Sequence, residues 1–259
     1  MKKKDTLTNR NGQTVSVIIE QTDTPNGLCF ILHGLGGYKE QLHIEAIAEA
    51  FLDADVTTVR IDATNGIGES DGDYENANCT EFLDDLEDVI KWAEGEEWYD
   101  EPFFLAGHSL GSMAVCYYAA KNPQIVMGIA PISTVVAGKF TIETTPKDAL
   151  KAQEESGFWI RTSRSKPGVV LKLKWHQFKK DILKYDLLRI ADKITMPVLL
   201  VVGENDEGTT PEHQSLLFEA LPGKKDIHVI SGAKHTFREQ EHLEILKHVI
   251  KHWVKTIEQ

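Results

Sequence analysis

The sequence is poor in cysteine, in long apolar runs and in excess positive charge, and each shortage excludes a class of protein. Only three cysteines occur in 259 residues, far apart and without a CxxC pair: Cys29, Cys79 and Cys116. This pattern fits neither a disulfide framework nor a thiolate metal site, so we expect reduced, mostly buried thiols. Apolar runs such as Leu28 to Leu32 are far shorter than the ~20 residues that cross a bilayer, which predicts no transmembrane segment.

Acidic residues outnumber basic ones. There are 28 Lys and Arg against 40 Asp and Glu, which gives a formal net charge of −12. Most of the surface therefore repels phosphate backbones, and we expect no nucleic-acid partner. Three lysines follow Met1, but the stretch from Asp5 to Gly12 is mostly polar and does not supply the apolar segment of a signal peptide. These features predict a cytoplasmic location.

Apolar, β-rich runs alternate with amphipathic helical patterns along most of the chain. Strands are predicted at residues 14–20, 28–33, 56–62, 102–106, 125–132, 196–203 and 226–230. Helices are predicted at residues 39–52, 110–121 and 211–221, around the stripe Phe82, Leu86, Val89 and Ala93, and around the stripe Leu243, Leu246, Ile250 and Trp253. This alternation predicts an α/β fold with a mostly parallel sheet covered on both faces, whose ligands bind beyond the carboxyl ends of the strands.

The alternation breaks between Val135 and Asp186. Residues 137–186 hold eleven Lys and Arg against six Asp and Glu, a net charge of +5, whereas the rest of the chain carries −17. We therefore predict an inserted helical lid at residues 135–186, and a core made of residues 1–134 and 187–259. Four aromatic side chains of this segment either line a substrate pocket or form its own small core: Phe158, Trp159, Trp175 and Phe178.

The pentapeptide GHSLG at residues 107–111 matches the pattern GxSxG and falls between a predicted strand and a predicted helix. Such an abrupt turn holds its serine in a strained conformation and needs small residues on both sides. Ser109 is then exposed at the end of the sheet as a nucleophile. The backbone N–H of Leu110, at the start of the helix, is suited to stabilise a developing oxyanion. The alternative is a turn whose serine only caps a helix.

A serine nucleophile needs a histidine base and a carboxylate that orients it, in the chain order Ser, acid, His. Asp206 and His235 each follow a predicted strand of the second half, and they complete this order with Ser109. Glu204 and Glu207 are the other candidate acids. The sequence therefore predicts a catalytic triad of Ser109, Asp206 and His235.

A second oxyanion donor is expected in the loop after an early strand, and the glycine-rich segment at residues 33–37 has the required flexibility. We assign this donor to the backbone N–H of Leu35. The alternative is a phosphate-binding loop, but neither GxGxxG nor GxxxxGK[ST] occurs there.

Five ordered motifs resemble those of the α/β-hydrolase superfamily: HGLGGYKE at 33–40, GIGESDG at 66–72, GHSLG at 107–111, GENDEGTTP at 203–211 and GAKHTF at 232–237. The chain is most similar to the serine carboxylesterase group that contains cinnamoyl and feruloyl esterases and the monoacylglycerol-lipase-like hydrolases of the serine aminopeptidase S33 type. The resemblance implies the α/β-hydrolase fold, and it gives the five site residues the roles assigned above. It departs from many relatives at Ile67, where they have histidine, and at Ser112, where they have glycine.

The resemblance implies ester hydrolysis through an acyl-enzyme, with a small-molecule ester as substrate. The mechanism requires no cofactor and no metal, and relatives of this size are monomers or homodimers. Other readings stay open: a lipase or lysophospholipase, a thioesterase, a peptidase, or a binding protein that kept the fold without catalysis.

Overall fold

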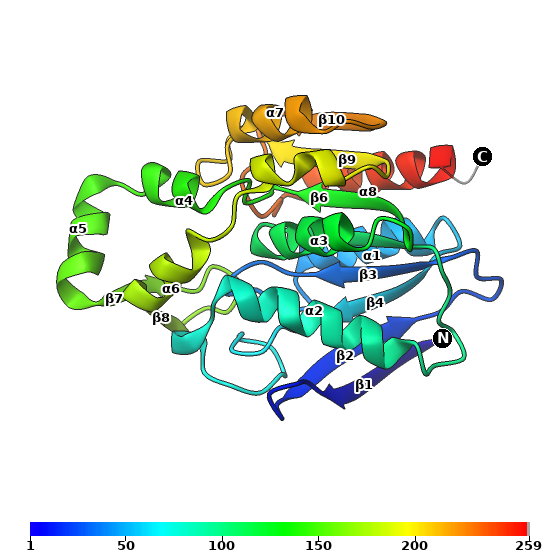
Figure 1. Ribbon diagram of the computed structural model, residues 1–259, viewed down its shortest axis with the longest axis horizontal. Coiled ribbons are helices and arrows are strands. Elements are labelled where there is room, and N and C mark those ends of the chain that lie inside the picture. Colours follow the sequence, from blue (N-terminus) through cyan, green and yellow to red (C-terminus); the bar gives the residue numbers. More distant parts are fainter. Residues whose placement is uncertain (258–259) are drawn as a thin grey trace.

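An eight-stranded sheet runs through the centre of the computed structural model, which describes residues 1–257 (Figure 1). Its strands lie in the order β1-β2-β4-β3-β5-β6-β9-β10. Their bounds are β1 (Lys2–Thr8), β2 (Thr14–Glu20), β3 (Leu28–Leu32), β4 (Thr57–Ile61), β5 (Phe103–His108), β6 (Val126–Ile132), β9 (Val198–Gly203) and β10 (Lys225–Ile230). β2 pairs antiparallel with β1 and β4, and the other pairings of this sheet are parallel. The predicted, mostly parallel sheet is therefore confirmed.

Strand β1 is missing from the predicted elements. Leu7 is its only buried side chain, so its sequence shows no apolar alternation. The strand forms because its backbone pairs with β2 along its whole length, from Lys2 opposite Glu20 to Thr8 opposite Thr14. Its lysines suit an outermost strand, since charged side chains discourage pairing with a further chain.

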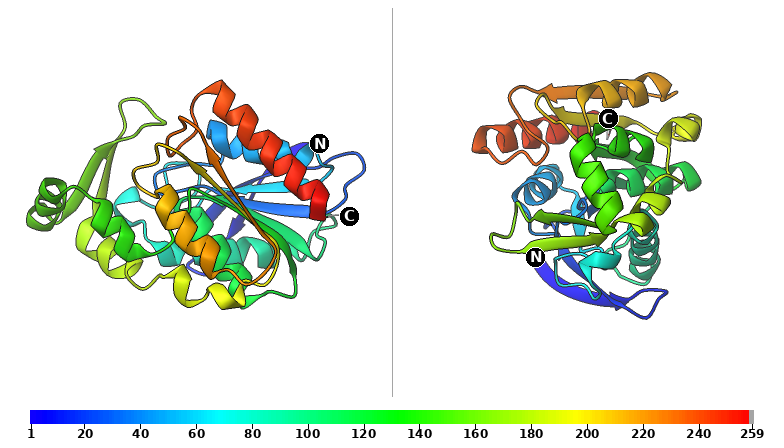
Figure 2. Two further views of the ribbon diagram at one scale, coloured as in Figure 1. Left: turned by 90° about the horizontal axis from the view of Figure 1, so that it is seen from above. Right: turned by 90° about the vertical axis from the view of Figure 1, so that its left-hand side faces the viewer.

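Helices cover both faces of the sheet, as the view from above shows (Figure 2). Two helices pack against each other on one face: α1 (Leu42–Leu52) and α8 (Gln240–Ile257). Three cover the other face: α2 (Cys79–Ala93), α3 (Leu110–Lys121) and α7 (Pro211–Ala220). Each face has its own hydrophobic core, and the predicted stripes of α2 and α8 are buried in them. The α/β-hydrolase arrangement expected from the sequence is thereby confirmed.

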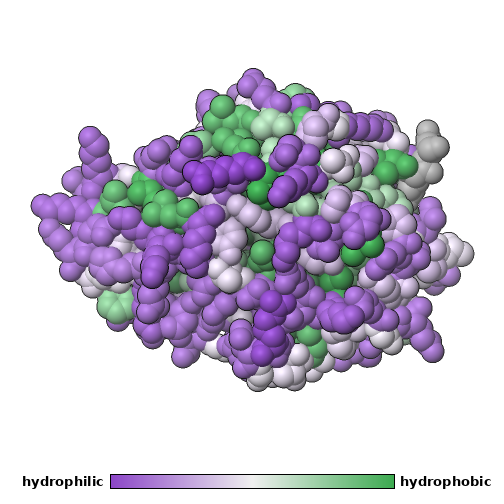
Figure 3. Space-filling view, in the orientation of Figure 1, coloured by the Kyte–Doolittle hydropathy of each residue, from purple (hydrophilic) through white to green (hydrophobic). Residues whose placement is uncertain are grey.

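The segment between β6 and β9 projects from one end of the sheet (left in Figure 1). It contains α4 (Gly138–Thr144), α5 (Lys147–Ser156), β7 (Phe158–Thr162), β8 (Val170–Lys174) and α6 (Trp175–Ile182), and we call residues 138–182 the insert. β7 and β8 form a separate antiparallel sheet, so the insert is not purely helical as expected. Figure 3 shows that this face of the molecule, the insert included, is mostly hydrophilic. The domain boundaries at residues 134 and 187 stay a prediction.

The insert lies at the end of the sheet toward which the arrowheads of β3 and β6 point (Figure 1). Parallel strands bring their carboxyl ends to one edge, where ligands bind in open α/β sheets. The loops after β3, β5, β9 and β10 carry the residues predicted for the site. Short 3-10 helices complete the chain: η1 (Tyr74–Asn76), η2 (Leu187–Arg189) and η3 (Ala191–Lys193). In residues 1–257 we find no helix with the length and apolar character to cross a membrane.

Candidate active site

Ser109 lies in a sharp turn between β5 and α3. Its φ of 55° falls in the left-handed region, which side chains other than glycine rarely adopt. A Cβ atom on Gly107 would lie 2.7 Å from the backbone carbon of Gly111, and one on Gly111 would lie 2.3 Å from the carbonyl oxygen of Leu32. Only glycine fits at these two positions, so the sequence GHSLG is what permits the turn.

The structure brings Ser109, His235 and Asp206 together in one chain of hydrogen bonds. His235 Nε2 lies 3.1 Å from Ser109 Oγ, and His235 Nδ1 lies 2.8 Å from Asp206 Oδ2. Because the Asp206 carboxylate accepts from Nδ1–H, the neutral ring has its lone pair at Nε2 and accepts a proton from the serine hydroxyl. This arrangement is able to activate a serine as a nucleophile.

Asp206 is 3% exposed and fully hydrogen-bonded. Besides His235, its carboxylate accepts from the backbone N–H groups of Gly208 and Thr209, each at 3.0 Å, and from the Thr209 hydroxyl at 2.8 Å. Burial by itself raises the pKa of Asp206, but the bonds and charge of His235 and the donors of Thr209 outweigh it and lower the pKa. The carboxylate therefore stays ionised beside the imidazole.

Glu204 and Glu207, the other candidate acids, are both exposed. Glu204 accepts hydrogen bonds from the Ser231 hydroxyl and the Gly232 backbone N–H, so it fastens the turn after β10. Of the three candidate acids, only Asp206 bonds to His235 within residues 1–257.

The two predicted oxyanion donors belong to segments that adjoin Ser109. Leu110 is the first residue of α3, and Leu35 is in the β3–α1 loop, residues 33–41. This loop touches the serine, since a Cβ atom on Gly34 would lie 2.9 Å from Ser109 Cβ. Within residues 1–257, neither the Leu35 N–H nor the Leu110 N–H has a hydrogen-bond acceptor. The absence of an internal acceptor is compatible with the predicted role, which stays a prediction.

A family model described as serine aminopeptidase, S33, matches residues 23–177, which is more than half of the chain. The chain belongs to the serine aminopeptidase S33 family. This membership and the relatives below indicate a hydrolase, and the resemblance inferred from the motifs is confirmed.

Two curated proteins and one solved structure are similar over much of this S33-family chain. An uncharacterised 31.7 kDa protein of Escherichia coli is 24% identical over 255 residues, 86% of this chain and 88% of that protein. The mitochondrial palmitoyl-protein thioesterase ABHD10 of Bos taurus is 25% identical over 189 residues. That match spans 72% of this chain and 60% of that protein. The structure of Est1E from Butyrivibrio proteoclasticus with ferulic acid bound has a TM-score of 0.81 at 24% identity, and the match covers 99% of this chain and 98% of that one.

His33 fixes the peptide group that carries the Leu35 N–H. The carbonyl oxygen of Gly34 belongs to this peptide group, and it accepts from the Gly37 N–H at 2.9 Å and from His33 Nδ1 at 2.8 Å. His33 Nε2 in turn accepts from the Ala63 N–H at 3.1 Å, which defines the neutral tautomer. Burial lowers the pKa of His33, so the ring stays neutral and keeps this arrangement. Because a trans peptide group is planar, holding its carbonyl also orients its N–H.

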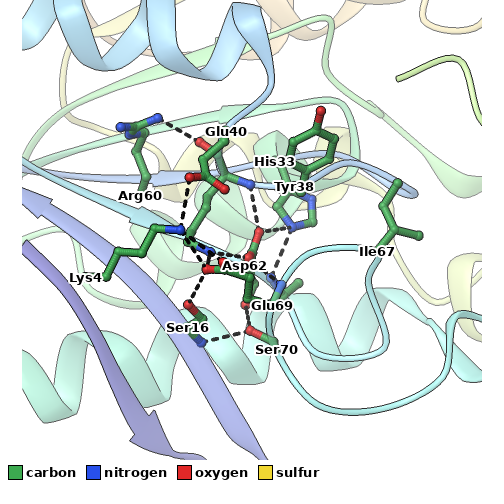
Figure 4. Close-up of polar contacts among 12 residues, drawn as sticks. Lys4, Ser16, His33, Tyr38, Glu40, Arg60, Asp62, Ile67, Glu69 and Ser70 are labelled. Carbon is green, nitrogen blue, oxygen red and sulfur yellow. Dashed lines mark hydrogen bonds and ion pairs between the residues drawn. The ribbon is translucent and has the colours of Figure 1, made fainter. Parts of the chain in front are cut away.

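A buried ion pair holds the other end of the β3–α1 loop (Figure 4). Lys39 is fully buried, and its Nζ lies 2.5 Å from Asp62 Oδ2 and 2.7 Å from Glu69 Oε2. Asp62, also buried, accepts from the backbone N–H groups of Lys39 at 2.7 Å and Glu69 at 2.8 Å. The hydrogen bonds from Lys39 and Lys4 lower the pKa of Glu69 to about 2. These contacts join the β3–α1 loop to the loop after β4.

Sequence reasoning missed these supporting residues. His33, Lys39 and Asp62 stand within or beside the predicted motifs, but no local pattern shows which backbone group each of them holds. The same is true of His108 in the GHSLG motif, whose side chain bonds to the backbone of His235.

The aromatic residues of the insert divide into two groups. Trp175 is 1% exposed and Phe178 2%, and both belong to the hydrophobic core. Their burial favours a core role for these two residues, in continuity with the core of the main sheet, and the predicted substrate contact stays a prediction. Trp159 packs edge-on against Trp175 but is only partly buried. Phe158 is also partly buried, beneath the ammonium group of Lys172 at 3.8 Å from its ring centre.

Proposed function

We propose that this protein is a serine carboxylesterase that hydrolyses carboxylic esters through an acyl-enzyme. Ser109 is the nucleophile, His235 the general base, and Asp206 the acid that orients it. The backbone N–H groups of Leu35 and Leu110 stabilise the oxyanion. The observation that supports this proposal most strongly is the continuous hydrogen-bonded chain from Ser109 Oγ through the His235 ring to Asp206.

The reaction follows from this geometry. Ser109 Oγ attacks the acyl carbon while its proton passes to His235 Nε2, and the negative carbonyl oxygen faces the N–H groups of Leu35 and Leu110. When the tetrahedral intermediate collapses, the protonated His235 donates its proton to the leaving alkoxide and an alcohol departs. Water then gives a proton to His235 and attacks the acyl group, so that the carboxylic acid is released and Ser109 is restored.

Esters of short acyl chains or of hydroxycinnamic acids are the proposed substrates. The motifs and the similar fold of Est1E, solved with ferulic acid, support this choice. A thioester is the second candidate, because a relative at 25% identity is named a palmitoyl-protein thioesterase. Both substrate types pass through the same acyl-enzyme at Ser109, so the leaving group is what distinguishes them.

A substrate panel tests the proposal. It comprises p-nitrophenyl esters from acetate to palmitate, methyl ferulate, a monoacylglycerol, a palmitoyl thioester and a peptide p-nitroanilide, with Ser109→Ala as the control. We expect turnover of at least one ester that disappears in Ser109→Ala, and a preference that identifies the acyl group. Turnover of the thioester or the peptide alone would replace the esterase assignment by that activity. Equal turnover by Ser109→Ala, or tight binding of an ester without turnover, would overturn the proposal.

A further inference from the structure

The β7–β8 hairpin of the insert touches the loop that carries Leu35. Arg161, on β7, donates from Nη2 to the carbonyl oxygen of Leu35 at 2.8 Å and to the Tyr74 hydroxyl at 2.9 Å. Its guanidinium group also lies over the ring of Trp159, 4.7 Å from the centre. A single arginine thus connects the insert, the β3–α1 loop and η1.

Other contacts also hold the β7–β8 hairpin against the β3–α1 loop. Gln41 donates to Ser165 Oγ at 2.6 Å, and the Lys166 ammonium group lies over the Tyr38 ring, 4.6 Å from its centre. Gly36 has a φ of 70°, and a Cβ atom there would lie 2.9 Å from both Arg161 Nη2 and a methyl group of Leu171. The absence of a side chain at Gly36 is what allows the hairpin to come this close.

Two peptide groups meet at Leu35, and they are held from different parts of the molecule. The first carries the Leu35 N–H, and it is held within the β3–α1 loop by the buried His33 and by Gly37. The second carries the Leu35 carbonyl, and Arg161 of the insert holds it. A hydrogen bond from a guanidinium group is stronger than one between neutral groups. Holding the second peptide group limits rotation about the N–Cα and Cα–C bonds of Leu35, so Arg161 adds a second anchor for the loop that carries the Leu35 N–H.

We propose that Arg161 is a positioning residue for the oxyanion hole: by binding the Leu35 carbonyl it aligns the Leu35 N–H with the reacting carbonyl of the substrate. The inference rests on the proposed esterase function. It makes the insert part of the catalytic apparatus, because an enzyme whose hairpin is displaced holds the Leu35 donor through His33 and Gly37 alone. In serine hydrolases, removal of one oxyanion donor lowers kcat by about 10²- to 10³-fold, and misalignment of a donor lowers kcat by a smaller factor.

The test compares Arg161→Met and Arg161→Lys with Arg164→Met. Arg164 is exposed on the same hairpin and has no side-chain hydrogen bond or ion pair within residues 1–257, so its variant controls for the loss of charge. We expect kcat to fall about 10- to 100-fold in Arg161→Met with KM changed less than about threefold, and Arg164→Met to match the wild type. Arg161→Lys keeps the charge but not the planar guanidinium group, whose Nη2 donates both hydrogen bonds, so it should restore kcat only in part.

A comparison of esters that differ in their acyl chains gives the decisive measurement. An oxyanion hole binds the carbonyl oxygen that all esters share, so the fall in kcat should have the same factor for each ester of the panel. A fall that depends on acyl length, a change confined to KM, or unchanged kinetics in Arg161→Met would overturn the inference. Tyr74→Phe is the second variant, to be used if Arg161→Met does not fold. It removes the other partner of Arg161 without changing Leu35, and we expect a small fall in kcat with the same factor for every ester.

Failure of this inference differs from failure of the proposed function. If the wild type hydrolyses esters through Ser109 and Arg161→Met does so equally well, only the role of Arg161 is wrong. If the wild type hydrolyses no ester and Ser109 does not react with a fluorophosphonate, the esterase assignment itself is wrong.

Discussion

His108 Nε2 donates a hydrogen bond to the backbone carbonyl oxygen of His235 over 2.7 Å. His108 is the residue directly before Ser109, so the segment that carries the nucleophile also holds the backbone of the base. Burial, together with the nearby charge of His235, lowers the pKa of His108 to about 3. The His108 ring is therefore neutral at physiological pH, and the tautomer with hydrogen on Nε2 is the one that fits its acceptor.

Replacement of His108 by Phe should impair catalysis while filling the same space. The His235 carbonyl would lose its donor, and the loss of such a bond costs about 1–3 kcal/mol. We expect kcat to fall at least about tenfold with little change in KM, because the base is less well placed. His108→Gln, which retains an N–H donor, should recover part of the loss. Steady-state kinetics of both variants provide the measurement, and wild-type kcat in His108→Phe would refute the role of this bond.

The buried histidines should make the protein less stable in acid. Burial holds the pKa of His43 well below its ordinary 6.5, and the neighbouring rings of His108 and His235 add to this effect. Below pH 6.5 the unfolded chain binds a proton at this residue that the folded chain does not, so the free energy of unfolding decreases as the pH falls. One such histidine accounts for about 2 kcal/mol between pH 7 and pH 5.

The variant His43→Phe tests this pH dependence. Its unfolding free energy should drop between pH 7 and pH 5 by about 2 kcal/mol less than that of the wild type. Urea denaturation at the two pH values gives both numbers, and His248→Phe, at an exposed position, is the matched control. An identical pH dependence in His43→Phe and the wild type would show that His43 does not titrate with unfolding.

The buried pair of Lys39 and Asp62 should matter far more for stability than the exposed lysine beside it. Lys39→Met leaves the Asp62 carboxylate buried without its ammonium partner, which costs about 3–5 kcal/mol. Lys4 also binds Glu69, at 3.0 Å, but its side chain is 51% exposed, and Lys4→Met should cost less than about 1 kcal/mol. Chemical denaturation at pH 7 measures both losses. Equal losses in the two variants would mean that burial of the Lys39 pair has no energetic consequence.

Trp175 should behave as a core residue and not as a substrate contact. Trp175→Ala removes a buried indole and should lower the free energy of unfolding by about 3–5 kcal/mol. Trp175→Phe keeps an aromatic ring, although it loses the 2.9 Å bond from the indole N–H to Glu154, and it should cost less. Thermal and chemical denaturation provide the test. A stable Trp175→Ala protein with a raised KM would restore the pocket role that the sequence suggested.

The arrangement of the site residues follows from patterns that are local in the sequence. Ser109, Asp206 and His235 each stand where an apolar strand gives way to a polar, glycine-containing turn, and parallel strands bring such turns to one edge of the sheet. The strands and helices around them were therefore predictable, and so was the meeting of these three side chains.

The remaining features depend on partners that are distant in the chain. β1 is polar and forms because β2 offers it a backbone edge. β7 and β8 pair with each other in a sheet of their own, so they lack the apolar pattern of the strands in the main sheet. In the sequence, Arg161 is one of many basic residues of the insert, and it is 126 residues away from Leu35; only the fold brings the two into contact. No periodicity or motif contains that information.

Reaction of the protein with a fluorophosphonate, followed by intact mass measurement and peptide mapping, tests the central claim most directly. We predict one adduct per chain, located on Ser109, absent in Ser109→Ala, and formed more slowly by a factor of at least about 10³ in His235→Ala, which lacks the general base. The absence of an adduct, an adduct on another residue, or equal labelling of His235→Ala would contradict the assignment of Ser109 as a nucleophile activated by His235.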